Sequence, residues 1–188
     1  MDMIHRIKYK TKTKKYRVSL IKRGLSFIID AYIGALFGTI PISVATTIIL
    51  GEVTQNIFLL PKAIAIISLI CSLLCLLFYY FYIPYKIYPG QTLGKRFFNI
   101  QIEYKNRKEL WKRQVVGYIL LEGGLTSGGK VIFQLLSILT GYNMVSIFND
   151  IFTSISLFSI ALLLLSSQHK MLHDYIAKTE VREFIKVT

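Results

Sequence analysis

Two charged residues at the start of the first long apolar stretch could take part in proton or cation chemistry. Arg23 and Asp30 lie seven residues apart in the segment KRGLSFIID, which continues as an apolar run. Seven residues make nearly two helical turns, so the two side chains share nearly the same face, roughly 10 Å apart along the axis. A carboxylate near hydrocarbon costs roughly 3 kcal/mol or more unless it is protonated, hydrated or paired. Asp30 is therefore a candidate for binding a proton or a cation.

Three basic residues are candidate partners of Asp30. Arg23 lies at the membrane interface and reaches only part of the way along the helix. Lys95 and Arg96, in the loop after the second apolar stretch, become partners if that loop folds back against the helices. Ionisable residues inside a membrane mark functional sites by default. A structural ion pair that fixes the register of the helices is the competing interpretation.

Glu122 and Lys130 raise the same question in the third apolar stretch. They flank the segment GGLTSGG, and Lys130 is the basic residue nearest to Glu122 along the chain. We expect these two residues to be secondary intramembrane charges, with either a functional or a structural role.

His169, His173 and Asp174 lie in the segment HKMLHD and invite comparison with a metal site. Histidines four residues apart share one face of a helix, and a divalent metal could use them together with the aspartate. Histidine at a helix end more often interacts with the helix dipole and with lipid headgroups, so we expect no metal. Adjacent helical residues do not face each other, so His173 and Asp174 are not expected to form a catalytic pair.

Two other patterns that could hold a cofactor lack residues that such a site needs. GLTSGGKV resembles a phosphate-binding loop, but Val131 stands where such a loop needs Ser or Thr. Cys71 and Cys75 lie one helical turn apart in an apolar stretch and are too few for a zinc site. The sequence offers no clear pair of nucleophile and base, so we expect neither a cofactor nor an enzyme.

Membrane helices are the elements that must position these residues. Of the 188 residues 53% are hydrophobic, and the mean hydropathy of +0.50 is unusual for a soluble domain. A spanning helix needs roughly 20 apolar residues. We therefore expect an all-α polytopic transmembrane helix bundle with about four membrane segments, the third broken by glycines: residues 24–50, 63–85, 114–140 and 145–167.

Three blocks of basic residues indicate the topology. Of 23 Lys and Arg, nine lie in residues 1–23, eight in 86–113 and four in 168–188. Nucleic-acid-binding domains gather such residues on one face of a folded module, so no nucleic-acid partner is expected. Lys and Arg favour the cytoplasmic side of short loops. The positions of the basic blocks therefore predict that both termini are cytoplasmic and that residues 24–167 form the membrane domain, with a first helix that is not cleaved. We also expect the basic segments to contact the anionic headgroups of the lipid bilayer.

Two segments leave alternatives open. Residues 86–113 contain the alternating segment NIQIEY and a turn at KNRK, which favours a short cytoplasmic loop or hairpin. The third apolar stretch is either a broken helix of the kind that binds ligands in transporters, or an interfacial helix at 108–122 followed by a shorter tilted span. Trp111, Lys112 and Arg113 favour an interfacial anchor at its start.

Four landmarks occur together and in a characteristic order. Arg23 precedes the first apolar stretch, Asp30 lies within it, the segment GQTLGKRFFNIQIE follows the second, and HDYIAKTEV lies near the end. Together they resemble the RDD family of bacterial membrane proteins, which is named for one arginine and two aspartates. The resemblance assigns Arg23 to the arginine, Asp30 to the first aspartate and Asp174 to the second. The glycine-broken segment 114–150 departs from the usual pattern of the family.

The resemblance implies a multi-pass protein of the bacterial cell membrane with a transport-related role. Some members of the family have been linked to Na⁺/H⁺ antiport, and a protonatable Asp30 could exchange a proton for a cation. Four helices are few for transport, so a homo-oligomer or another membrane protein is an expected partner. The alternative is a non-catalytic accessory or immunity protein that acts through a protein or peptide partner. We expect one charge cluster at the cytoplasmic helix ends, formed by Arg23, Asp30, Lys95, Arg96, His173 and Asp174.

Overall fold

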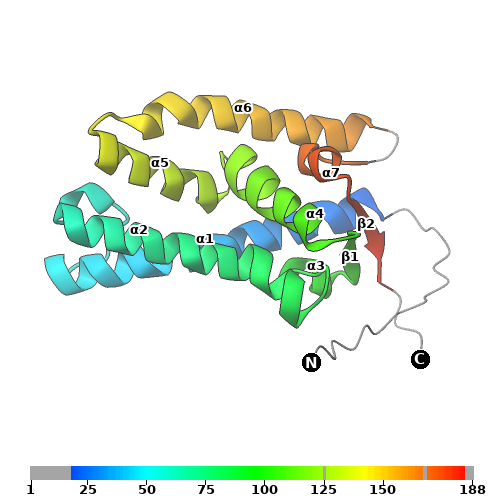
Figure 1. The fold of residues 1–188 in the computed structure, drawn as a ribbon, viewed down its shortest axis with the longest axis horizontal. Helices are drawn as coiled ribbons and strands as arrows, with labels where there is room; N and C mark the ends of the chain where they lie inside the picture. The colour runs from blue at the N-terminus through cyan, green and yellow to red at the C-terminus, as the bar shows by residue number, and fades with distance from the viewer. Residues whose placement is uncertain (1–17, 125, 167–168, 185–188) are drawn as a thin grey trace.

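Helices make up most of the protein. The computed structural model describes residues 18–124, 126–166 and 169–184. The long helices are α1 (Leu20–Leu50), α2 (Lys62–Leu77), which continues as η2 (Phe78–Ile87), and α6 (Met144–Leu165). The shorter helices are η1 (Ile57–Leu59), α3 (Leu93–Phe97), α4 (Arg107–Trp111), η3 (Lys112–Leu121), α5 (Ser127–Thr140) and α7 (Leu172–Ala177). Figure 1 shows the long helices running along one elongated bundle.

Three helices in the described part of the chain are long and apolar enough to cross a membrane. They are α1, the continuous helix Lys62–Ile87, and α6, with 31, 26 and 22 residues. α5 is apolar but has only 14 residues. The expectation of a mostly helical membrane protein is confirmed at this level, with three candidate spans and one shorter apolar helix.

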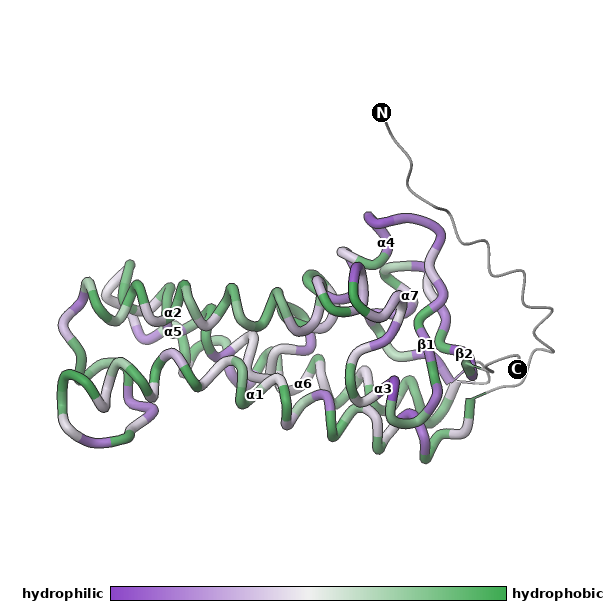
Figure 2. Tube along the Cα trace, turned by 90° about the horizontal axis from the view of Figure 1, so that it is seen from below, coloured by the Kyte–Doolittle hydropathy of each residue, from purple (hydrophilic) through white to green (hydrophobic). Residues whose placement is uncertain are grey.

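Helix α1 packs against its neighbours mainly through small and polar side chains, and many of its large apolar side chains are exposed. Large apolar side chains such as Ile28, Tyr32 and Ile40 point outwards from α1, and Figure 2 shows how hydrophobic the long helices are. In lipid, small residues allow helix backbones to approach closely, so this inverted arrangement suits a membrane bundle. The buried face of α1 consists of Arg23, Ser26, Asp30, Gly34, Gly38, Ile42 and Thr46.

The third apolar stretch forms two short helices in succession. η3 is a π-helix, and the N–H of Glu122 donates to the carbonyl of Gly117 at its end. The chain then turns at Gly123, and α5 begins at Ser127. A Cβ on Gly129 would lie 2.7 Å from the carbonyl carbon of Gly123, so only glycine allows the backbone to pack this closely across the break.

A small sheet and short helices close one end of the bundle. Strand β1 (Ile100–Glu103) pairs antiparallel with β2 (Glu180–Glu183). The strand expected in NIQIEY is present. Of the two expected alternatives, a loop or a hairpin, the hairpin does not form, because α4 follows β1 and the partner strand comes from the C-terminal segment. The all-α expectation is corrected accordingly: the described residues are mostly helical with one two-stranded sheet.

The described parts of the three basic segments share this end of the bundle. Figure 1 shows α3, α4, α7 and both strands there, beside the start of α1. An ion pair of 2.7 Å between Lys22 and Glu183 joins the start of α1 to β2. Most of the expected N-terminal basic segment, residues 1–17, lies outside the described residues.

Candidate functional site

The carboxylate of Asp30 is enclosed by the α3 loop, which we define as residues 88–98. Asp30 is only 1% exposed. Its Oδ1 accepts hydrogen bonds from the Tyr79 hydroxyl at 2.7 Å and from the Gly94 N–H at 2.9 Å. Its Oδ2 accepts from Thr92 Oγ1 at 2.5 Å and from Lys95 Nζ at 2.7 Å. A carboxylate offers about four acceptor positions, so those of Asp30 are filled.

Glycines allow the α3 loop to reach α1. Gly90 has a φ of +74°, which favours glycine, and its carbonyl accepts the N–H of Ile102 at 2.7 Å. Gly94 brings α3 against α1, where a Cβ would lie 2.5 Å from the carbonyl oxygen of Ser26. The loop thereby places Lys95 beside Asp30. Burial lowers the pKa of Lys95, and the opposing charge of Asp30 limits that decrease.

Replacing Gly94 by Ala is expected to destabilise the protein by about 1–3 kcal/mol, because the added methyl group overlaps the α1 backbone and the Asp30 carboxylate. Thermal unfolding in detergent micelles measures this loss. Gly24→Ala is the matched control, since a Cβ at Gly24 has nothing within 4 Å and alanine favours the helix. Equal unfolding temperatures for the two variants would show that the close contact at Gly94 is not needed.

A second buried carboxylate, Asp174 of α7, binds two arginines. Arg23 Nη2 donates to Oδ2 at 2.6 Å, and Arg113 Nε donates to Oδ1 at 2.9 Å. The Met171 N–H also donates to Oδ2, at 3.2 Å, which caps the start of α7. Burial alone would raise the pKa of Asp174, but the positive charges of Arg113 and Arg23 outweigh it and hold the pKa well below its usual value.

The third buried carboxylate, Glu122, lies at the glycine break and binds His173. The distance from His173 Nδ1 to Glu122 Oε2 is 2.7 Å, and the Ser159 hydroxyl donates to Oε1. The other ring nitrogen, Nε2, lies 2.9 Å from Nη2 of Arg113. Arginine can only donate, so Nε2 is the acceptor and the ring proton is assigned to Nδ1, which donates to Glu122. This hydrogen-bond pattern corresponds to a neutral His173 and an ionised Glu122.

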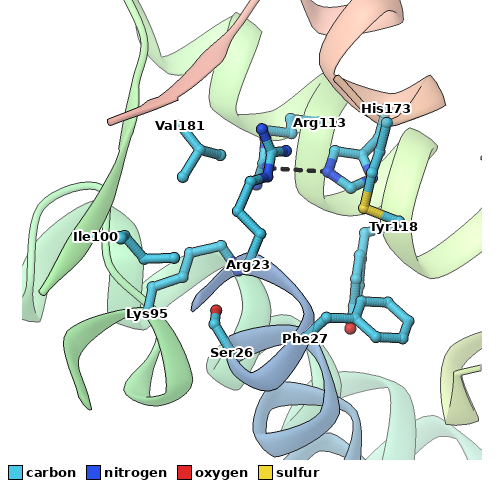
Figure 3. Close-up of a pocket in the computed structure, with 10 residues that line it drawn as sticks. Arg23, Ser26, Phe27, Lys95, Ile100, Arg113, Tyr118, His173 and Val181 are labelled. Carbon is cyan, nitrogen blue, oxygen red and sulfur yellow. Dashed lines mark hydrogen bonds between the residues drawn. The ribbon is translucent and has the colours of Figure 1, made fainter. Parts of the chain in front are cut away.

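A small cavity lies between the Asp30 and Asp174 ion pairs. Its volume is about 20 Å³, which is room for about one water molecule. Figure 3 shows the side chains around it, with the hydrogen bond between Arg113 and His173 at its upper side. The polar and charged groups of its lining come from α1, α3, η3 and α7: Arg23, Ser26, Lys95, Arg113, Tyr118 and His173.

Residues 17–178 match the model of the RDD family. The chain belongs to the RDD family. The matched range includes Arg23, Asp30 and Asp174, and it ends just after α7. No curated protein and no solved structure matches the chain.

The charge cluster of this RDD protein is divided into two ion-pair sites. Asp30 pairs with Lys95, as the sequence suggests for a loop folded back against α1. Arg23 pairs with Asp174 and also donates to the carbonyl of His169 at 2.6 Å. Arg23 therefore joins α1 to the C-terminal segment instead of turning towards Asp30 on its own helix.

Arg96 and Lys130 lie outside these ion pairs. Arg96 is exposed, and its guanidinium carbon lies 3.7 Å from the centre of the Tyr88 ring. Lys130 is exposed on α5, and Glu122 pairs with His173 instead. The basic residue nearest to Glu122 along the chain is therefore not its partner, because the turn after η3 directs Glu122 towards α7.

Two expectations about neighbouring residues also need correction. His173 Nε2 lies 3.7 Å from Asp174 Oδ1, so these adjacent residues do approach each other, at the start of a short helix. Arg113 is not an interfacial anchor, because it is 2% exposed and paired with Asp174. Like Arg23, it is the last basic residue before an apolar stretch, and that shared position is the sequence feature that indicates it. Sequence reasoning also misses the hydroxyl donors of the site: Tyr79, Thr92 and Ser159.

Proposed function

We propose that this RDD protein exchanges a cation for a proton across the membrane, with Glu122 and His173 as the proton-carrying pair. The observation that supports this role is the buried contact of 2.7 Å between carboxylate and imidazole beside the glycine break. Histidine is the side chain that changes charge near neutral pH, and a carboxylate at membrane depth can bind either a proton or a cation. The proposed role is transport, and it includes no enzymatic step.

We also propose that the end of the bundle with the sheet and α7 faces the cytoplasm. Basic residues of the loop 86–113 and of the C-terminal segment lie at this end, and Lys and Arg favour the cytoplasmic side. In this orientation η3 and α5 together make the third of four crossings, and both termini are cytoplasmic. The same basic residues suit contact with anionic lipid headgroups.

In the proposed mechanism a proton enters from the cavity that His173 lines. Nε2 of His173 accepts a hydrogen bond from Arg113 and lies 3.7 Å from Asp174 Oδ1. A proton bound at Nε2 converts this acceptor into a donor, so Arg113 loses its bond and the new N–H can turn to Asp174. His173 can then release its Nδ1 proton to Glu122. Proton binding at the pair is therefore linked to a movement of Arg113, which connects η3 to α7.

The role of Asp30 in this proposal is structural, which differs from the exchange site expected from the sequence. Four donors fill its acceptor positions, so a cation could bind only after the α3 loop has moved away. Glu122 instead accepts from the imidazole and the backbone N–H of His173 and from the hydroxyl of Ser159. A carboxylate with a titratable partner is better suited to release and rebind a proton.

Replacing Glu122 by Gln is expected to abolish cation-dependent proton movement while the protein remains in the membrane. Everted vesicles from cells lacking other antiporters are energised to form a pH gradient, and Na⁺ or K⁺ is added at matched protein levels. The wild-type protein should dissipate the gradient, and Glu122→Gln should reduce this response at least tenfold. Glu52→Gln, at an exposed glutamate of the loop after α1, is the matched control and should respond like the wild type.

Two outcomes would contradict the proposal. A wild-type protein that never dissipates the gradient, with any alkali cation, rules out the exchange itself. A fully active Glu122→Gln variant rules out Glu122 as the proton carrier.

A second candidate function is that of a non-catalytic membrane protein that acts through a protein or peptide partner. The full pairing of Asp30 and Asp174 favours it, because charges that are filled by donors hold helices together without further change. This function predicts no gradient dissipation by the wild type, and a lower abundance of Glu122→Gln in the membrane.

A further inference from the structure

Helix α6 is the least covered of the three candidate spans. Only 17% of its apolar window is buried inside the protein, against 22% for α1 and 39% for Lys62–Ile87. Its packing partners include α5, η3 and α7, and Figure 1 shows it along the outer edge of the bundle. The buried residues of α6 are Ser156, Ser159 and Leu163, all in its second half. Most of its surface therefore faces the surroundings of the single chain.

The first half of α6 exposes a polar stripe, which we define as Ser146, Asn149, Asp150 and Ser154. Ser146, Asp150 and Ser154 follow one another at intervals of four residues and so share one helix face. The hydroxyls of Ser146 and Ser154 bond to carbonyls of their own chain, at 3.1 and 2.8 Å. The carboxylate of Asp150 forms no ion pair with any residue that the structure describes. A carboxylate on the lipid-facing side of a span is costly without a partner.

A basic residue stands beside the stripe. Lys130 of α5 is exposed and makes no ion pair within the described residues. It lines the same cavity of about 220 Å³ as Asn149, the neighbour of Asp150, so the two charges lie at a similar depth. Each chain thus carries, on exposed parts of α5 and α6, a positive and a negative charge that form no ion pair within the described residues.

We propose that this surface, the polar stripe of α6 together with Lys130, binds a second copy of the chain. Two copies in one membrane have the same orientation. A twofold axis along the membrane normal therefore brings together residues that lie at the same depth in the two copies. Lys130 of each copy then faces Asp150 of the other, and the hydroxyl and amide groups of the two stripes can bond across the interface. A self-complementary surface is what an isologous dimer requires. This inference does not rest on the exchange proposed above.

Charge reversal in two separate chains tests the interface. Chains labelled at the N-terminus with a donor or an acceptor dye are reconstituted into lipid vesicles at low protein density, and energy transfer is measured. Wild-type chains should show transfer well above that of randomly placed chains. Lys130→Glu alone brings two acidic residues together in each contact, and Asp150→Lys alone brings two basic residues together. Each variant alone should lose at least tenfold in dimer fraction.

A mixture of the two variants shows whether each substitution disrupts only the interface or the fold of the chain itself. In a Lys130→Glu chain paired with an Asp150→Lys chain, both contacts again join opposite charges, so energy transfer should return towards the wild-type level. Wild-type chains at the random level, variants that dimerise like the wild type, or a mixture that fails to recover would each overturn the proposal. Such results would favour an arrangement in which Asp150 contacts lipid headgroups or another protein.

Discussion

Replacing Asp174 by Asn is expected to lower the free energy of unfolding by about 3–5 kcal/mol, because it leaves two buried arginines without their counter-charge. Arg23 and Arg113 donate to opposite oxygens of this carboxylate, at 2.6 and 2.9 Å. Asparagine keeps the shape of the side chain but turns one of these acceptors into a donor. Three elements, α1, η3 and α7, meet at Asp174, so the loss should loosen the whole end of the bundle.

Thermal unfolding in detergent micelles measures the effect of Asp174→Asn, with circular dichroism for the helices and the fluorescence of Trp111 for this end of the bundle. Glu103→Gln is the control, because Glu103 forms an exposed ion pair with Arg182 at 2.6 Å and such pairs contribute at most about 1 kcal/mol. Adding Arg113→Met to Asp174→Asn should restore part of the stability, since one unpaired charge is removed. If Asp174→Asn unfolds like Glu103→Gln, the two arginines are not held by this carboxylate.

The three buried carboxylates differ in how firmly their partners fix their charge. Arginines stay protonated at any physiological pH, so Asp174 remains an anion as long as the fold persists. Asp30 combines one lysine with three neutral donors from the loop and from η2. Glu122 has no arginine or lysine in its ion pair, and its partner is the titratable imidazole of His173. This ranking, from fixed to titratable, is the physical reason for assigning proton exchange to Glu122 and structural roles to the two aspartates.

The long helices follow from the sequence because crossing a membrane depends on local composition. The expected stretches 24–50 and 63–85 coincide closely with Leu20–Leu50 and Lys62–Ile87. The sheet does not follow in the same way. Alternation in NIQIEY indicates a strand, but its partner, Glu180–Glu183, lies far along the chain and is brought there by the folding of α7 against η3. The local sequence pattern predicts the strand, but its partner strand is determined by tertiary packing.

The residue types of the candidate site can also be predicted, and Lys95 is already a candidate partner of Asp30 in the sequence, but the other pairs cannot be predicted. Charges in apolar stretches stand out, so Arg23, Asp30 and Glu122 are visible in the sequence. Their partners depend on how separate helices approach one another, as the contact of Arg23 with Asp174 shows. Neutral donors such as the N–H of Gly94 are invisible in any charge pattern, yet they decide that Asp30 is fully bonded.

Replacing Asp30 by Asn is expected to release the α3 loop from α1 and to speed hydrogen exchange at the Gly94 amide by about 100-fold or more. The Gly94 N–H is buried against the Asp30 carboxylate at 2.9 Å, so it reports directly on this contact. The substitution would leave the Lys95 ammonium without a counter-charge in a buried position, which costs about 3–5 kcal/mol when one partner of a buried pair is removed. Each 1.4 kcal/mol of easier opening corresponds to about a tenfold faster exchange through open states.

The release of the loop can be separated from a general loss of stability by two further variants. Arg96→Met removes the neighbouring cation on α3, which is exposed and stacks on Tyr88, and it should leave exchange at Gly94 nearly unchanged. Lys95→Met combined with Asp30→Asn removes both charges of the pair and should restore much of the protection, because no unpaired charge is left. Exchange at Gly94 that stays slow in Asp30→Asn would mean that the neutral donors alone hold the loop. Asp30 would then be free to lose its charge, and an exchange function at this carboxylate would regain support.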